Sequence, residues 1–137
     1  MKNIVLISCA SKKLNNKAKA KDLYISPLFK LNLSYAQSLN PDNIFILSAE
    51  HGLLNLDDEI SPYNKTLNKM SKDEIKQWSI KVKEQLNKVI DMNNDKVIFL
   101  AGEKYRKYLM PYIKNYEIPL KSLGIGKQLR YLKERLK

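Results

Sequence analysis

Three short runs of apolar residues interrupt a chain that is otherwise rich in lysine and asparagine. Residues 2–8 (KNIVLIS), 44–48 (IFILS) and 96–101 (KVIFLA) are apolar almost throughout. Continuous apolar runs of this length are typical of strands that are buried on both faces of a parallel sheet. A shorter run at 117–120 (EIPL) predicts a further strand at the edge of that sheet.

Helical periodicity fills the segments between these runs. Serine followed by proline at 26–27 is a strong helix start, because serine caps the first turn and proline needs no hydrogen bond there. Ser71 and Glu74 form a capping box in front of the most regular apolar stripe of the chain. Further helices are predicted at 103–110 and 124–137.

Strands that alternate with helices predict an α/β fold with a parallel sheet. We expect one domain over residues 1–137, because this length is ordinary for a single domain and neither a repeat nor a linker interrupts it. The predicted architecture is a three-layer sandwich, with helices on both faces of a mostly parallel sheet of about four strands. Residues 9–22 are polar and are expected to form a loop.

Composition narrows the functional classes. No apolar run approaches the roughly 20 residues that span a bilayer, so no membrane association is expected. The single Cys9 cannot form an internal disulfide, which favours a cytoplasmic protein. One cysteine and one histidine make a metal site unexpected. Neither a P-loop nor a dinucleotide fingerprint is present, so no cofactor is expected.

Positive charge is concentrated near the end of the chain. The net charge is +11, of which residues 103–137 carry +7. A basic face of this kind is typical of proteins that bind polyanions, although lysine is also a common solvated surface residue. The side chains proposed to contact nucleic acid are Lys127, Arg130, Lys133 and Lys137.

Three strand ends are expected to meet at one edge of the sheet, because parallel strands all point the same way. The segments that follow them begin at Ser8, Ser48 and Ala101. Ligands of open α/β sheets bind at such carboxyl edges. The sequence therefore predicts a site that these segments share.

The only histidine lies directly after the second of these strands. His51 is the expected group for proton transfer, because its ordinary pKa lies near neutral pH. Glu50 and Asp58 are the other candidate catalytic groups. Each has an alternative structural interpretation: His51 as a residue of the turn before Gly52, and the carboxylates as caps or as partners of surface lysines.

Residues after the first strand favour anion binding. Serine hydroxyls, ammonium groups and backbone N–H groups at 8–13 suit a phosphate. Cys9 is interpreted either as a nucleophile or, more commonly for a single cysteine, as a packing residue. The residues proposed to bind substrate are Ser8, Cys9, Ser11, Lys12, Lys13, Tyr24, Ser48, Gly52, Tyr63, Gly102 and Tyr105, the tyrosines by stacking on a base.

The segment 46–54 (ILSAEHGLL), followed by Asp57 and by SPY at 61–63, resembles the signature of the YaaA-like peroxide-stress proteins. The chain resembles more closely a family of short bacterial and phage proteins with the elements SCxxK, LYxSPLF, LSAxHGL, PY, LAGxxY and GxGxQL. All of these elements are present, between Ser8 and Leu129. The resemblance implies an association with DNA or nucleobases, in folds similar to those of base-exchange enzymes and uracil glycosylases.

The leading hypothesis is an enzyme that acts on a nucleobase or its N-glycosidic bond, in DNA, RNA or a free nucleotide, with DNA favoured. Reaching a base inside a duplex requires that the base be flipped out. One alternative is a non-catalytic DNA-binding protein that protects DNA under stress. Another is a hydrolase or transferase of small nucleotides. The sequence leaves the oligomeric state open.

Overall fold

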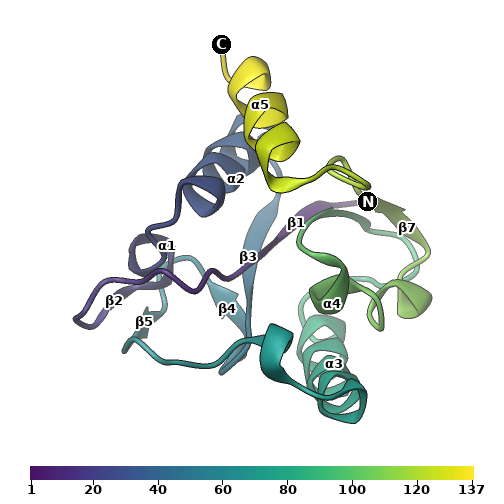
Figure 1. Ribbon diagram of the computed structural model, residues 1–137. Helices are drawn as coiled ribbons and strands as arrows, with labels where there is room; N and C mark the ends of the chain where they lie inside the picture. Colours follow the sequence, from purple (N-terminus) through teal and green to yellow (C-terminus); the bar gives the residue numbers. More distant parts are fainter.

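The computed structural model describes residues 1–137 and contains a five-stranded central sheet in the order β4-β3-β1-β6-β7 (Figure 1). The strands of this sheet are β1 (Asn3–Ser8), β3 (Asn43–Ser48), β4 (Gly52–Asn55), β6 (Lys96–Leu100) and β7 (Asn115–Glu117). β1, β3, β6 and β7 run parallel, whereas β4 pairs antiparallel with β3. A separate antiparallel pair joins β2 (Ala18–Lys19) to β5 (Glu59–Ile60). The prediction of a mixed α/β fold with a mostly parallel sheet is confirmed.

Five α-helices accompany the sheet. They are α1 (Ala20–Leu23), α2 (Pro27–Ser38), α3 (Lys72–Asn87), α4 (Glu103–Arg106) and α5 (Ile125–Arg135), with short 3-10 helices η1 (Leu67–Lys69) and η2 (Met110–Tyr112). The two predicted helix starts are confirmed. Ser26 Oγ accepts a hydrogen bond from the Phe29 N–H at 3.2 Å, and Ser71 and Glu74 form the capping box.

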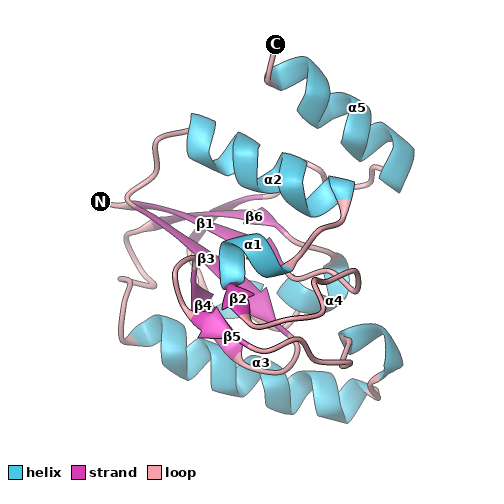
Figure 2. Cartoon of the chain, turned by 90° about the vertical axis from the view of Figure 1, so that its left-hand side faces the viewer, coloured by secondary structure: helices cyan, strands magenta, loops and turns pink.

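The apolar residues of β1 pack alternately on the two faces of the sheet. Ile4 and Leu6 belong to a core cluster that includes α3, and Val5 and Ile7 belong to a second cluster that includes α2. Figure 2 shows α2 and α3 on opposite sides of the strands. α5 packs on α2, where Leu132 is fully buried. No helix combines the length and the apolar character that crossing a membrane requires.

One strand was not predicted, and the predicted edge strand lies earlier in the chain than expected. The sheet has five strands, because residues 52–55, expected to be loop, form β4 by folding back antiparallel on β3. The predicted strand at 117–120 is instead β7 at Asn115–Glu117. Pro119 has no N–H group to donate, which explains why pairing with β6 ends before it. The expected loop 9–22 also contains β2 and the first residues of α1.

The order of the strands favours a ligand site at the carboxyl ends of β1 and β6. From β1 the chain passes through α2 to β3 on one side, and it later returns through α3 to β6 on the other side. Outside the carboxyl ends of two strands whose connections diverge in this way, α/β sheets leave room for a ligand.

Candidate functional site

A cleft of about 910 Å³ opens at the carboxyl ends of β1 and β6. Its walls come from residues 8–12 after β1, residues 101–106 after β6, the start of α2, the loop around η1, and the segment from 118 to 129 that leads into α5. The volume lies within the range of small-molecule sites, which is about 300–1,000 Å³. The cleft therefore occupies the position that the strand order favours for a ligand.

Basic side chains dominate the charged part of the cleft. Lys12, Lys65, Lys104 and Arg106 line it, and Glu103 is the only carboxylate that does. Arg106 is held in place because its Nη1 donates a hydrogen bond to the Ala101 carbonyl at 2.9 Å. This balance of charge favours an anionic ligand.

The lining also contains apolar side chains and three primary amides, those of Asn32, Asn68 and Gln128. Leucines 28, 100, 120, 123 and 129 line the cleft together with Asn32 and Gln128. Gln128 Nε2 donates a hydrogen bond to the Leu123 carbonyl at 2.8 Å. Asn32 is only 5% exposed, and its buried Oδ1 has no hydrogen-bond partner. An unpaired buried group of this kind costs about 1–3 kcal/mol, so the position calls for an explanation.

Cys9 lies in the cleft beside Tyr105. The Cys9 thiol donates a hydrogen bond to Tyr105 Oη at 3.4 Å, and the Cys9 N–H donates to the Leu47 carbonyl at 3.0 Å. The Tyr105 ring packs edge-on against Trp78, with 5.6 Å between the ring centroids. Burial raises the pKa of Tyr105, so the phenol is neutral at physiological pH.

Three hydroxyl groups form a buried chain next to the cleft. Ser48 Oγ donates to Tyr63 Oη at 2.8 Å, and Tyr63 Oη lies 2.6 Å from Tyr24 Oη. Burial raises the pKa of Tyr24 to about 12 and raises the pKa of Tyr63 as well. The Lys13 ammonium lies 4.4 Å from the centroid of the Tyr63 ring, and burial lowers the pKa of Lys13.

The segment from Ser48 to Tyr63, which we call the β3–β4 corner, is closed by hydrogen bonds within it and to α3. Ser48 Oγ accepts a hydrogen bond from the His51 N–H at 3.0 Å, and the Ser48 carbonyl accepts one from Trp78 Nε1 at 2.9 Å. Gly52 has a φ of +75°, which suits glycine. The Leu53 N–H donates to Gln85 Oε1 at 2.9 Å.

The candidate catalytic groups of this corner either contact other residues of the corner or are exposed to solvent. The His51 ring packs edge-on against Tyr63, with 5.6 Å between centroids. Asp58 Oδ2 accepts a hydrogen bond from the Asn55 N–H at 2.8 Å, as a turn cap does. Asp57 pairs with Lys21 at 3.5 Å, and Glu50 is an exposed turn residue. None of His51, Glu50 and Asp58 lines the cleft.

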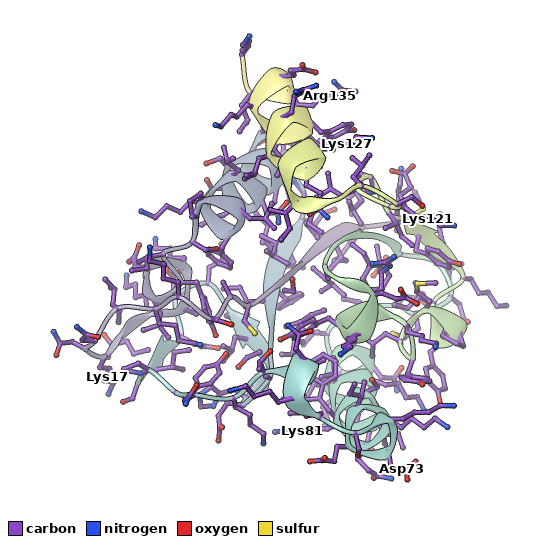
Figure 3. All side chains as sticks on the ribbon, viewed as in Figure 1. Lys17, Asp73, Lys81, Lys121, Lys127 and Arg135 are labelled. Atoms are coloured by element: carbon purple, nitrogen blue, oxygen red, sulfur yellow. The ribbon has the colours of Figure 1, made fainter.

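The basic residues proposed for nucleic-acid contact lie on and just beyond α5. Lys127, Arg130, Lys133 and Lys137 are all exposed, and their spacing of three and four residues keeps them along one side of the helix. Lys127 and Arg135 project from α5 at the outside of the molecule (Figure 3). Ile125 and Leu129 of the same helix line the cleft, so the basic side of α5 begins at its rim.

Residues 4–134 match a family of unknown function (DUF6884). The chain belongs to this family. No curated protein matches the chain. The family description names no reaction.

The cleft of this family member contains only part of the predicted site. Of the candidate substrate-binding residues, the cleft is lined by Ser8, Cys9, Ser11, Lys12, Gly102 and Tyr105. The others lie outside its lining: Lys13, Tyr24, Ser48, Gly52 and Tyr63. The ends of β1 and β6 thus meet as expected, whereas the end of β3 turns into β4.

The structure also brings in residues that were not predicted for the site. Asn32, Lys65, Glu103, Arg106 and Gln128 line the cleft. Two of them could have been found from the sequence, because they lie in motifs of the family that the chain resembles: Glu103 in LAGxxY and Gln128 in GxGxQL. Asn32 had none, since it lies inside an amphipathic helix at a position that an apolar residue would suit.

Proposed function

We propose that this protein is an enzyme that acts on a nucleobase or its N-glycosidic bond, with one nucleotide held in the cleft. The nucleotide is either free or flipped out of a strand, and DNA is the favoured source. The resemblance to YaaA-like proteins supports the same class of substrate. We assign the reaction to the cleft and not to the β3–β4 corner.

The observation that carries the proposal is the mixed chemistry of the cleft lining. Lysine and arginine side chains suit a phosphate, and the leucines and primary amides of the same lining suit a flat base with polar edges. A nucleotide combines these two chemistries in one molecule. A purely apolar ligand would leave the cations unpaired, and a simple anion would leave the apolar wall in water.

Glu103 takes the catalytic role that was expected of His51, because it is the only carboxylate that lines the cleft. In hydrolysis, water adds to the sugar carbon as the glycosidic bond breaks. The base leaves with the bonding electron pair and takes up a proton from solvent, to which Glu103 later releases the proton that it accepts from the attacking water. Glu103 orients the water, accepts its proton and stabilises the positive charge that develops on the sugar.

Loss of Glu103 tests this role. Glu103→Gln should reduce base release from a single-stranded oligonucleotide by roughly 10²–10⁴-fold, the usual contribution of a general base. Released bases are measured by liquid chromatography with mass detection. Glu84→Gln, the same change on the exposed side of α3, is the control. Full activity of Glu103→Gln would exclude this role, and an absence of base release from DNA, RNA and nucleotides would overturn the enzyme proposal.

A second candidate function is DNA binding without catalysis, which the basic side of α5 favours. Reversing Lys127, Arg130 and Lys133 to Glu should abolish salt-dependent binding, measured by fluorescence anisotropy. The control reverses Lys72, Lys81 and Lys88, which are exposed in or next to α3. α3 and α5 lie at opposite ends of the molecule (Figures 1 and 3). Equal effects of both triple variants would show that only net charge matters.

A further inference from the structure

One polar side chain of the cleft is buried without a partner. Asn32 is 5% exposed and lines the cleft, and its Oδ1 accepts no hydrogen bond. Phe29 and Ala36, three residues before it and four after it, are buried in the core. Asn32 therefore occupies a core-facing position of α2, where an apolar side chain would leave nothing unsatisfied.

We infer that Asn32 is the specificity-determining residue of the cleft and that its amide turns on binding so that Oδ1 accepts a hydrogen bond from the donor on the edge of a nucleobase. This inference rests on the proposed function. It names the part of the ligand that is recognised and the residue that recognises it.

The chemistry of the amide supports a base edge. A primary amide places an acceptor oxygen beside an N–H donor, and every nucleobase presents a donor beside an acceptor on one of its edges. The terminal torsion of asparagine is broad and close to two-fold. Rotation by half a turn exchanges oxygen and nitrogen, so Oδ1, which is shielded from solvent in the free protein, can turn towards the ligand.

A phosphate is the less suitable partner for this position. Asn32 carries no charge, whereas Lys12, Lys104 and Arg106 in the same cleft supply the positive charge that a phosphate needs. Gln128 provides a second amide there, whose orientation is fixed by its bond to the Leu123 carbonyl. The cleft thus has separate groups for a charged ligand end and for an uncharged polar edge.

The test compares four nucleoside monophosphates with their N-methylated counterparts. AMP, CMP, GMP and UMP are titrated into the protein, followed by N6,N6-dimethyl-AMP, N4,N4-dimethyl-CMP, N1,N2,N2-trimethyl-GMP and N3-methyl-UMP, with isothermal titration calorimetry as the readout. Methylation blocks the donor of the base and leaves the phosphate unchanged. We expect wild-type protein to bind at least one unmodified nucleotide ten-fold or more tightly than its methylated counterpart.

Asn32→Leu should remove this discrimination and leave a weak affinity that is equal for both forms. Asn32→Ala repeats the test without adding side-chain volume. Asn87→Leu, the same change at the exposed end of α3, is the control and should discriminate as wild type does. Circular dichroism establishes that each variant is folded before titration.

The possible failures can be told apart. The role of Asn32 is overturned if wild-type protein binds methylated and unmodified nucleotides equally tightly, or if both Asn32 variants still discriminate between them. Either result leaves the proposed function standing. An absence of binding by wild-type protein to any of these nucleotides overturns the role of Asn32, whereas the proposed function falls only if no base is released from DNA, RNA or nucleotides.

Discussion

The cleft and the β3–β4 corner are neighbours at the same edge of the sheet, but they treat polar groups in opposite ways. In the corner, Ser48 makes three hydrogen bonds, to Tyr63, to the His51 N–H and to Trp78. In the cleft, Asn32 Oδ1 has no partner. Folded proteins satisfy almost all of their buried polar groups, so a group left unpaired at the edge of a cavity indicates where a ligand completes the structure.

The comparison changes how a conspicuous sequence segment is interpreted. The corner contains the only histidine and the densest acidic cluster, yet its polar groups serve to close a tight turn between two strands. The cleft is formed by residues from five distant segments, few of which are conspicuous alone. The segment richest in polar residues is thus the structural corner, whereas the cleft is the region in which a buried polar atom lacks a hydrogen-bond partner.

The largest effect is expected when the turn of the corner is distorted. Gly52→Ala should lower the free energy of unfolding by about 2–4 kcal/mol, because φ is positive and the added Cβ collides with Gln85 Oε1, the acceptor of the Leu53 N–H. Urea denaturation measures the change. Gly126→Ala is the control, because nothing lies near its Cβ position. A wild-type midpoint for Gly52→Ala would contradict the view of the corner as a structural element.

Removal of the hydroxyl of Ser48 should have a smaller effect. Ser48→Ala leaves the His51 N–H without its acceptor and removes a donor to Tyr63, at a cost of about 1–3 kcal/mol in the free energy of unfolding. The melting temperature checks this prediction. Ser79→Ala is the matched control. Ser79 is also buried, but its hydroxyl bonds only to the Ile75 carbonyl within the same helix, so its loss should matter less.

In the cleft, the same kind of change should act in the opposite direction. Asn32→Leu should raise the free energy of unfolding of the ligand-free protein by about 1 kcal/mol, because it replaces an unpaired buried amide by an apolar group of similar size. Urea denaturation without nucleotide measures it. A loss of stability as large as that of Ser48→Ala would mean that Asn32 is satisfied in the free protein, and the contrast between the two regions would disappear.

The sequence predicted what depends on local patterns. The apolar runs indicated β1, β3 and β6, and the capping box at Ser71 marked the start of α3. It did not predict β4, because GLLN is short and becomes a strand only through pairing with β3. The same holds for the site: the burial of Asn32 depends on tertiary packing, which the periodicity of α2 alone does not contain.

The smallest effect on stability is expected at alkaline pH, where a tyrosine in the hydroxyl chain of Ser48, Tyr63 and Tyr24 begins to ionise. The ordinary tyrosine pKa is about 10, and burial raises that of Tyr24 to about 12 in the folded protein. The folded state therefore holds this proton more tightly than the unfolded state. The stability that depends on it is present below pH 10 and is lost as pH rises from 10 towards 12.

Urea denaturation of wild-type protein and Tyr24→Phe between pH 8 and 11 isolates this contribution. The variant lacks the ionisable group, so its stability should fall less steeply above pH 10 than that of wild-type protein. Lys13, whose pKa is lowered by burial, has the opposite dependence but is present in both proteins and cancels in the comparison. Parallel curves for the two proteins would mean that Tyr24 ionises as freely in the folded state as in the unfolded chain. The hydroxyl chain would then be open to solvent, and the corner would be less closed than its hydrogen bonds imply.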